Sequence, residues 1–513
     1  MITEENTVRV LDCFVESLDL EKLGFQHMKP AKKGTPPYHP KVLLKIYIYG
    51  YFNRVRSSRK LEVECGRNIE MKWLTDNQAP SYHTISDFRS IEPHRKALRQ
   101  VFRLFNQLLK KARLFGGETV AIDGTKINAQ NSKKNNISEE KLNKRLEHNL
   151  DKWEEYEAEL DRADELEAKG IAPDVSPDAF LEAMAELDAR TDKLFELKKM
   201  LRDAQAIDPS CNQISLTDPD ARAMPLNNRG IVDVCYNVQS AVDDKHCLVA
   251  DFEVENVPDS ALLSKTAIAV KIELGSQTLN ALADKGYHDS GELHKCAENN
   301  ITTYVAFPDQ SFKDRPKGFT KDDFPFDPET DSYTCKNKEQ LTTNGTIYEK
   351  KGRNGEVQSR FRRYSLSFST CKDCPFADKC LSENDRETRH GRHIERNIYE
   401  TARIENKTRV INNRPTYKRR QAIVEHPFGT IKRSWGFYYT LLKGKEKVRA
   451  EYSLVFLVYN LRRAINILGT EGLKKWINDA FALFWPHSSL PAEPERRGHK
   501  VRPRKPLPAN LTW

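Results

Sequence analysis

The chain has 513 residues and a mass of 59.2 kDa, with 83 Lys and Arg against 74 Asp and Glu, a formal net charge of +9. That length allows about three or four domains of roughly 100–200 residues each. A mean hydropathy of −0.70 argues against a membrane protein, and the longest apolar run, Ser453–Leu461, is about half of the roughly 18 residues that a membrane span needs. The first residues lack the basic and apolar regions of a secretory signal, so we expect a cytoplasmic protein.

The positive charge is unevenly distributed along the chain. Residues 139–203 hold 20 acidic and 11 basic side chains, a net charge of −9, which leaves +18 for the remainder. Residues 414–449 hold 10 basic and 2 acidic side chains, a net charge of +8. A basic excess of this kind indicates a polyanionic partner, most simply nucleic acid. The alternative is a solvated surface of ordinary ion pairs.

Residues 1–115 are predicted to be mostly helical. Val42–Phe52 is apolar on nearly all faces, which predicts a buried helix. Basic residues surround it, so we expect a helical N-terminal DNA-binding domain over residues 1–115, although ordinary solvent-facing helices would show the same pattern. These basic residues are Arg54, Arg56, Arg59, Lys60, Arg95, Lys96 and Arg99.

The next part of the chain predicts an α/β core. The β-branched run Glu118–Asp123 predicts a strand that Gly124 ends. Further strands are predicted over residues 231–242, 246–254, 278–283 and 302–306, with helices over about 259–274 and 290–299. Hairpin strands followed by alternating helices and strands are typical of a ribonuclease-H-like core, which we assign to residues 116–137 and 206–306.

Other segments are expected to be attached to this core. Residues 138–205 predict an inserted acidic helical hairpin, with Ser176 as the N-cap of its second helix. Residues 307–400 lose all periodicity and predict a Cys-rich insertion without regular structure. Helical character resumes near 415, and residues 401–470 are assigned to catalytic C-terminal helices of the core. Residues 471–513 predict a basic, Pro-containing tail that is partly disordered.

Two aspartates follow predicted strands at glycine-containing turns. Asp123 precedes Gly124, and Asp284 begins the sequence Asp-Lys-Gly-Tyr. Strand ends hold carboxylates rigidly at the rim of a sheet, and two of them on neighbouring strands can share hard cations such as Mg²⁺. A single strand-end aspartate is more often a turn residue, so the prediction rests on the pair.

Glu425 is the candidate for a third carboxylate. It lies in the helix predicted over Tyr417–Arg433, whose other charged residues are basic. Lys432 follows nearly two turns later, at about 100° per residue, so the two side chains are expected on one face. Pro427 is expected to disturb this helix locally. Taken alone, a helical glutamate such as Glu425 is far more often an ordinary salt-bridge partner.

Three segments carry a resemblance to a known family. Ala121–Lys126, Ala283–Tyr287 and Val424–Arg433 resemble the three catalytic blocks of bacterial insertion-sequence transposases of the Asp-Asp-Glu type, in particular the group of insertion sequence eleven-eighty-two. The resemblance covers nearly the whole chain. Residues 59–66 and 84–89 resemble the N-terminal domain of that group, and the segments 126–132 and 459–468 also match it.

The resemblance implies a catalytic triad of Asp123, Asp284 and Glu425 that holds two Mg²⁺ ions, with Mn²⁺ as a substitute. It implies a DNA transposase that cuts at the terminal inverted repeats of an insertion sequence and joins the 3′ ends to target DNA by two-metal phosphoryl transfer. The implied partners are double-stranded DNA and a second copy of the chain, as a homodimer on DNA. No membrane partner is expected, and the protein would associate with the nucleoid when bound to DNA.

Basic residues around Glu425 are the expected DNA contacts. The related insertion-sequence-four transposases carry a Tyr, Arg, Glu, Lys signature in which Arg lies four residues before Glu. Lys432 keeps the spacing to Glu425, and Tyr417 keeps the spacing to Arg420. Arg420 lies five residues before Glu425, which departs from the signature. The residues expected to contact DNA are Lys432, Arg433, Tyr417, Arg420 and Lys126.

A cysteine cluster lies in the insertion over residues 307–400. Cys371, Cys374 and Cys380 form a Cys-x2-Cys-x5-Cys pattern, and Cys335 lies upstream. Cys-x2-Cys places two thiolates within reach of one tetrahedral Zn²⁺, and an insertion without a core gains stability from such a site. We expect these four residues to bind structural zinc, with reduced thiols in a loop as the alternative and no disulfides. The remaining cysteines, expected as buried small hydrophobes, are Cys13, Cys65, Cys211, Cys235, Cys247 and Cys296.

Alternatives remain for the function and for three residues near the blocks. A catalytically silent DNA-binding protein derived from a transposase would keep the same fold, and a ribonuclease-H-like nuclease would cut DNA without joining it. His426 would point about 100° away from Glu425 and is interpreted as structural or DNA-facing. Asp218 and Asp220 are interpreted as turn residues, with support of the catalytic carboxylates as the alternative.

Overall fold

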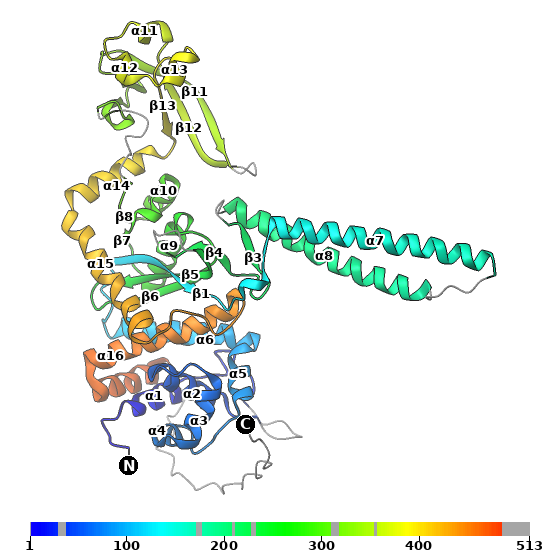
Figure 1. The fold of residues 1–513 in the computed structure, drawn as a ribbon. Coiled ribbons are helices and arrows are strands. Elements are labelled where there is room, and N and C mark those ends of the chain that lie inside the picture. Colours follow the sequence, from blue (N-terminus) through cyan, green and yellow to red (C-terminus); the bar gives the residue numbers. More distant parts are fainter. Residues whose placement is uncertain are drawn as a thin grey trace.

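The computed structural model of the chain describes residues 2–28, 37–170, 177–207, 211–226, 232–308, 316, 318–352 and 357–484. A central sheet lies between a cluster of N-terminal helices and a smaller second sheet, and a pair of long helices projects to one side (Figure 1). None of the helices in the described ranges is long and apolar enough to cross a membrane. The expected N-cap Ser176 and the end of the expected tail, from residue 485 on, lie outside these ranges.

The first part of the chain is helical, as predicted. Helices α1 to α6 span Thr7–Glu16, Pro40–Phe52, Ser58–Arg67, Ile69–Leu74, Tyr82–Ser90 and Glu92–Lys111. α2 is the expected apolar helix, and every residue from Leu43 to Phe52 is buried. It begins where the His39 side chain accepts a hydrogen bond from the Lys41 amide, with Pro40 in the first turn.

The central sheet has eight strands in the order β2-β3-β4-β5-β1-β7-β8, with β6 also paired to β5. The strands β1 to β8 span Thr119–Asn128, Asn136–Ser138, Gln213–Ser215, Arg222–Pro225, Val232–Asp243, Val249–Glu255, Leu279–Ala283 and Ile301–Val305. β5 pairs antiparallel with β1 and β6, whereas β7 runs parallel to β1 and β8. The order β6-β5-β1-β7-β8 fits the predicted ribonuclease-H-like core.

Short helical segments connect the last strands of this sheet. The 3-10 helix η2 (Asp259–Ala261) and α9 (Leu263–Leu274) join β6 to β7. The 3-10 helix η3 (Lys285–Tyr287) and α10 (Ser290–Glu298) join β7 to β8. The sequence predicted helices over about 259–274, which η2 and α9 occupy, and over about 290–299, where α10 lies, but it did not predict η3. They place two short helical turns beside each other at the same edge of the sheet.

β1 is longer than predicted. Its pairing with β5 continues through Gly124, opposite Gln239, to Asn128. A Cβ added at position 124 would lie less than 3.0 Å from the Gln239 side chain, closer than real Cβ atoms approach. Glycine is required here by a close approach inside the sheet, and it does not end the strand. The expectation that Asp123 ends a strand is therefore wrong, because Asp123 lies within β1.

One hydrophobic core joins the N-terminal helices to the sheet. α6 and α16 (Lys445–Phe484) lie between these two parts (Figure 1). Asn106 of α6 and Asn460 of α16 are buried, hydrogen-bond each other at 2.8 Å, and both donate to the Val249 carbonyl of β6. Buried amides that are satisfied in this way fix the orientation of the two helices on the sheet.

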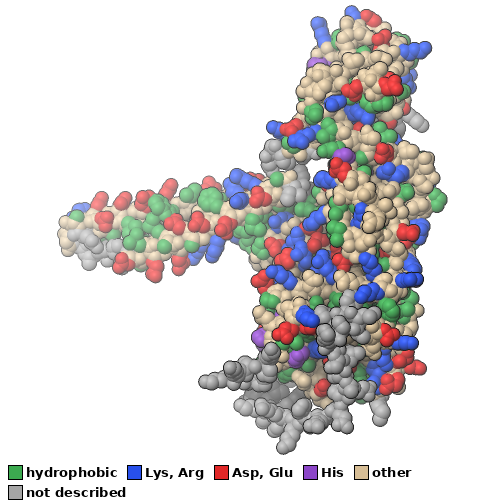
Figure 2. Space-filling view, turned by 180° about the vertical axis from the view of Figure 1, so that it is seen from behind, with side chains coloured by type: hydrophobic (Ala, Val, Ile, Leu, Met, Phe, Trp, Pro, Cys, Tyr) green, Lys and Arg blue, Asp and Glu red, His purple; other side chains and the backbone are tan. Residues whose placement is uncertain are grey.

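The expected acidic hairpin consists of α7 (Glu139–Ala168) and α8 (Pro177–Ile207). At its base, apolar residues of both helices form a small core with β2 and β3. Farther out, Asn149 donates a hydrogen bond to Thr191, and the rings of Tyr156 and Phe180 are in contact. Figure 2 shows hydrophobic side chains along the length of the hairpin among many acidic ones.

The region 307–400 was predicted to lack regular structure, and this prediction is wrong. Five strands form a separate sheet in the order β13-β12-β11-β10-β9. The strands β9 to β13 span Phe326–Asp327, Ser332–Thr334, Gln340–Lys351, Val357–Ser365 and His393–Asn397, and short helices α11 (Phe368–Lys372), α12 (Ala377–Cys380) and α13 (Glu383–Glu387) precede β13. β11 is exposed at most positions, so its sequence lacks the alternation of buried apolar residues that indicates a strand.

Helices resume earlier and end later than predicted. α14 begins at Glu400 (Glu400–Asn412), and α15 (Arg414–Phe428) is followed by a π-helix over Gly429–Ser434. α16 continues to Phe484 across a break at Gly469, where φ is 72°. The expected tail from residue 471 is thus helical as far as Phe484, because Leu473, Ile477 and Ala480 pack into the main core.

Candidate active site

Asp123 and Asp284 lie side by side where β7 ends next to the middle of β1. β1 and β7 run parallel, and Ala121 lies opposite Leu282. Two residues further along both strands, the same register places Asp123 level with Asp284. Asp284 follows β7 directly and caps η3, where its carboxylate accepts a hydrogen bond from the Gly286 amide at 2.8 Å. The two aspartates that the sequence singled out are therefore brought together.

The surroundings of Asp123 disfavour the ionised form of its carboxyl group. Burial raises the pKa of the Asp123 carboxyl to about 6; Arg420 lowers this pKa, and the neighbouring carboxylates of Asp284 and Asp259 raise it. Arg420 Nη1 lies 3.9 Å from Asp123 Oδ2. Crowded carboxylates favour a bound cation, and their oxygens are the ligand atoms that Mg²⁺ prefers. Asp123 and Asp284 therefore supply ligand atoms of the type that a divalent metal ion takes.

A third carboxylate, that of Asp259, lies beside this pair. Asp259 begins η2 after β6, and its Oδ1 accepts hydrogen bonds from Asn237 at 2.7 Å and Gln239 at 2.6 Å. Burial raises the pKa of the Tyr287 hydroxyl well above its ordinary value, and all three carboxylates raise it further. Sequence reasoning missed Asp259, because it lies five residues after the predicted strand 246–254 and has no glycine-containing turn beside it.

Glu425 lies on α15, the helix that packs against β1, β5 and β7. Its carboxylate is exposed and accepts a hydrogen bond from Gln421, one turn earlier, at 2.8 Å. Across the described ranges, no three His, Cys, Asp or Glu side chains are grouped closely enough to hold a metal ion. The structure thus pairs Asp123 with Asp284 and leaves Glu425 apart from them, on the helix whose Arg420 reaches Asp123.

Lys432 reaches β1 from the π-helix that follows α15. Its Nζ donates hydrogen bonds to Thr125 Oγ1 at 2.9 Å and to the Lys126 carbonyl at 3.0 Å. Burial lowers the pKa of the Lys432 ammonium. α15 runs through Pro427 and changes to the wider π form two residues later. The expectation that Glu425 and Lys432 share one face of a regular α-helix therefore does not hold. Glu425 is exposed, whereas Lys432 is half-buried.

The other residues expected to contact DNA differ in exposure and partners. Arg433 is exposed, and Tyr417 and Arg420 are half-buried on α15. Lys126 Nζ lies 3.4 Å from both carboxylate oxygens of Asp259. Arg420 is thus directed toward β1, Arg433 toward solvent, and Lys126 is already ion-paired.

Two features near the sequence blocks have structural contacts. The Nδ1 atom of His426 hydrogen-bonds the hydroxyl of Tyr459 in α16 at 2.7 Å, as the structural interpretation predicted. Asp218 is fully buried and accepts hydrogen bonds from the Tyr236 hydroxyl and the Gly444 amide. Asp218 therefore holds the loop that leads into α16, and its carbonyl accepts the Ala221 amide at 3.1 Å in a turn, as the turn interpretation predicted.

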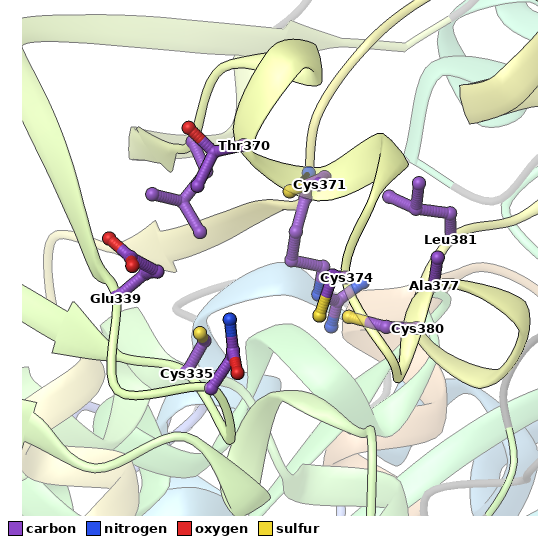
Figure 3. Close-up of a pocket in the computed structure, with 11 residues that line it drawn as sticks. Cys335, Glu339, Thr370, Cys371, Cys374, Ala377, Cys380 and Leu381 are labelled. Atoms are coloured by element: carbon purple, nitrogen blue, oxygen red, sulfur yellow. Dashed lines mark hydrogen bonds between the residues drawn. The ribbon is translucent and has the colours of Figure 1, made fainter.

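The four cysteines expected to bind zinc line one pocket beside the second sheet, shown in Figure 3: Cys335, Cys371, Cys374 and Cys380. Cys371 and Cys374 flank a turn closed by a hydrogen bond from the Cys374 amide to the Cys371 carbonyl at 3.3 Å. The Arg392 amide donates to the Cys371 sulfur at 3.4 Å, and burial raises the pKa of the Cys371 thiol. These contacts hold the sulfur-bearing turn against β13.

The cysteines outside this pocket are mostly buried. Outside the pocket, Cys65, Cys211, Cys235 and Cys296 are buried as predicted, whereas Cys13 and Cys247 are only partly buried. Burial raises the pKa of the Cys65, Cys235 and Cys296 thiols to about 12. Thiols with so high a pKa are unreactive and behave as small hydrophobic side chains.

Comparisons with known proteins give two matches, both to transposase families. Residues 1–90 match the family described as Transposase domain (DUF772), and residues 334–465 match the family described as Transposase DDE domain. The second match includes Glu425 and Lys432, whereas Asp123 and Asp284 lie between the two matched regions. No curated protein and no solved structure matches the chain. Two separate regions of this mixed α/β chain are therefore similar to domains of transposases.

Proposed function

We propose that this protein is a DNA transposase that cuts at the terminal inverted repeats of an insertion sequence and joins the 3′ ends to target DNA. The observation that carries the proposal is the pairing of Asp123 with Asp284 on parallel strands, in a chain whose residues 1–90 and 334–465 match transposase families. The narrower assignment to the group of insertion sequence eleven-eighty-two rests on the three sequence blocks. Its place of action would be the chromosome, in the cytoplasm.

In this proposal Asp123, Asp284 and Glu425 hold two Mg²⁺ ions, for which Mn²⁺ can substitute. When bound, the metal ions would make a water or a 3′-hydroxyl nucleophilic and stabilise the leaving oxygen. The protein's own part is to hold the carboxylates and to orient the phosphodiester between them. Glu425 is exposed and hydrogen-bonded to Gln421 on the same helix, so a change in its side-chain conformation would break no buried contact.

The DNA would lie along α15 and the π-helix. The most basic stretch of the chain, Arg414–Arg449 with a net charge of +8, surrounds Glu425. Figure 2 shows Lys and Arg side chains gathered on the body near the base of the α7–α8 hairpin. The residues proposed to contact phosphates are Lys432, Arg433, Tyr417, Arg420 and Lys126. The helices of residues 1–115 would add a second DNA contact, and a homodimer would pair the two ends of the element.

The decisive experiment uses the full chain with labelled element ends, target DNA and Mg²⁺. The ends are taken from inverted repeats in the DNA that flanks the gene. We expect nicked ends and joined products from the wild-type protein, and neither from Asp123→Asn, Asp284→Asn or Glu425→Gln. Glu405→Gln is the matched control, because Glu405 is also a helical glutamate, on α14, paired with Arg409.

Each other outcome favours a different function. End binding without cleavage by the wild-type protein would indicate a catalytically silent DNA-binding protein, and cleavage without joining would indicate a nuclease. Unchanged cleavage by the three triad variants would show that these residues are not the catalytic site.

We also propose that Cys335, Cys371, Cys374 and Cys380 hold a structural Zn²⁺. Support comes from the shared pocket and from the chemistry of the donors, since four thiols are a common ligand set for structural zinc. In the described ranges the four sulfurs are not grouped as closely as metal ligands, so zinc binding would draw them together. Bound zinc would tie the loop after β10 to α11 and α12, in a region whose own core is small. Metal analysis should find about one zinc per chain. A Cys371→Ser/Cys374→Ser protein that still held this zinc would overturn the proposal, with Cys13→Ser/Cys247→Ser as the control.

A further inference from the structure

The carboxylate of Asp259 is held by three side chains from two strands. Its Oδ1 accepts hydrogen bonds from Asn237 and Gln239 of β5, and Lys126 Nζ of β1 lies 3.4 Å from both of its oxygens. Asn237 and Gln239 are fully buried, whereas the Asp259 side chain is 26% exposed. A carboxylate held by two buried amides and an ammonium group has little freedom to move.

On one side, Asp259 contacts the strand that carries Asp123. A Cβ added at Gly124 would lie less than 3.0 Å from Asp259 Oδ1, so this carboxylate occupies the space that the glycine leaves open. The Gly124 amide in turn donates a hydrogen bond to Asp123 Oδ1 at 3.0 Å. The position of Asp259 therefore limits where the backbone next to Asp123 can lie.

On the other side, Asp259 is linked to the turn that carries Asp284. The amide nitrogen of Gln239 donates to Asp259, and its amide oxygen accepts a hydrogen bond from the buried Tyr287 hydroxyl. Tyr287 is the last residue of η3, the helix that Asp284 caps. Only one orientation of the Gln239 amide satisfies both neighbours. The placement of Tyr287 in η3 therefore depends on the placement of Asp259.

The contacts of Asp259 distinguish it from a metal ligand. Three donors already surround its carboxylate, and the closest two act on the same oxygen. Carboxylates and amides that orient the ligands of a metal, without binding it, typically contribute about 10–100-fold to metal affinity or activity.

We propose that Asp259 is a positioning residue of the active site, which sets the spacing between Asp123 and Asp284. It acts on Asp123 through Gly124 and on Asp284 through Gln239 and Tyr287. The inference rests on the proposed function of the aspartate pair and adds to it a residue that lies in neither of their sequence blocks.

The test measures metal binding separately from activity, with the full chain. Mn²⁺ binding is followed by the electron paramagnetic resonance signal of free Mn²⁺, end cleavage is measured over a range of Mg²⁺ concentrations, and thermal unfolding reports folding. We expect Asp259→Ala to weaken Mn²⁺ binding by about 10–100-fold and to raise the Mg²⁺ concentration that cleavage requires. Asp259→Asn should weaken Mn²⁺ binding less than Asp259→Ala, because its amide oxygen still accepts hydrogen bonds from Asn237 and Gln239.

Two further variants complete the design. Gln239→Leu breaks the link to Tyr287 without touching a metal ligand, and it should also weaken Mn²⁺ binding. Asp244→Asn removes another ion-paired aspartate next to β5, the partner of Arg419 at 2.8 Å, and should leave Mn²⁺ binding unchanged.

Two results would overturn the inference. One is wild-type Mn²⁺ affinity in both Asp259 variants. The other is a loss in Asp259→Asn as complete as that in Asp123→Asn, which would make Asp259 a ligand. A wild-type protein that neither binds Mn²⁺ nor cuts ends would instead overturn the proposed function, and this inference with it.

Discussion

The side chain of Lys432 donates a hydrogen bond to the hydroxyl of Thr125, a residue 307 positions earlier, with Nζ and Oγ1 2.9 Å apart. This contact joins the π-helix after α15 to the strand that carries Asp123. π-Helical turns are frequent at functional sites because they redirect side chains that a regular helix would align. Here the wider turn accompanies a lysine that lies against β1, while Glu425 stays on the exposed face of α15.

Substitution of Lys432 should separate its role in the reaction from its role in the fold. We expect Lys432→Met to lower end cleavage about 100-fold, the scale of one lost charge-stabilising donor. The loss of unfolding free energy should be smaller, about 1 kcal/mol for a hydrogen bond. Cleavage at saturating DNA and urea unfolding measure the two effects. Thr125→Val keeps the ammonium and should reduce cleavage less; equal cleavage by Lys432→Met and wild type would contradict the assignment.

The aspartate pair was predicted from the sequence for a partly wrong reason. Asp123 and Asp284 were selected as strand-end residues, yet β1 continues to Asn128, and the pair forms because β7 ends level with the middle of β1. Strand periodicity shows where a strand lies but not how far its neighbours extend. Gly124 was therefore interpreted as a stop signal, when it makes room for a carboxylate from the distant η2.

Other features were missed because they depend on contacts between distant segments. Asp259 gains its place from Asn237 and Gln239, whose buried amides resemble any other polar residues within a strand sequence. The second sheet was missed because the exposed strand β11 shows no alternation of apolar residues. The helical hairpin, in contrast, was predicted well, since the leucine spacing of α7 and α8 is a local signal.

The buried ion pair between Arg56 and Glu451 should be a main support for the C-terminal helix. Arg56 Nη1 lies 3.2 Å from Glu451 Oε1, and Glu451 also accepts the amides of Leu441 and Leu442. Removing one partner of a buried pair leaves an uncompensated charge and costs about 3–5 kcal/mol. We expect a loss of this size for Arg56→Met in urea unfolding of the full chain.

The control for this pair lies on the same helix. Glu446→Gln removes an ion pair with Arg449 in which Glu446 is 59% exposed, and such surface pairs contribute about 0–1 kcal/mol. The double variant Arg56→Met/Glu451→Gln should recover part of the stability that Arg56→Met loses, because it leaves no unpaired charge. If Arg56→Met lost less unfolding free energy than Glu446→Gln, Arg56 would not be needed to balance the charge of Glu451.

Gly124→Ala should perturb both stability and catalysis. The added methyl group would lie less than 3.0 Å from the side chains of Gln239, Asp259 and Asn237. Overpacking of this kind costs about 1–3 kcal/mol. We expect lower unfolding free energy and reduced end cleavage, because the methyl group pushes Asp259 from its place.

The matched control for this substitution is Gly472→Ala in α16. The nearest atom to an added Cβ there is 3.7 Å away, an ordinary contact, and alanine favours a helix over glycine by up to about 1 kcal/mol. This variant should be as stable as the wild type or more so. Wild-type stability and cleavage in Gly124→Ala would show that the sheet can widen at this point.

His94 should make the N-terminal helices less stable in mild acid. It is 1% exposed, its Nε2 accepts a hydrogen bond from the Gln26 amide at 3.0 Å, and its Nδ1 lies 2.8 Å from the Phe88 carbonyl. Burial lowers the pKa of the imidazole below 6.5; the Phe88 carbonyl raises this pKa in part, and the neighbouring His27 lowers it. The neutral ring satisfies both contacts, whereas protonation at Nε2 would remove the acceptor of the Gln26 amide.

The direction of the pH effect follows from this lowered pKa. The unfolded chain takes up the proton first as the pH falls, so the contribution of His94 is present above about pH 6.5 and is lost toward the lower folded-state pKa. We expect the unfolding free energy of the wild type to fall more steeply between pH 7.5 and 5.5 than that of His94→Gln, whose amide cannot titrate. Urea unfolding at the two pH values measures the difference. If the unfolding free energy changed equally in both proteins, the folded chain would accept the proton without losing stability. The Gln26 contact would then not depend on a neutral ring.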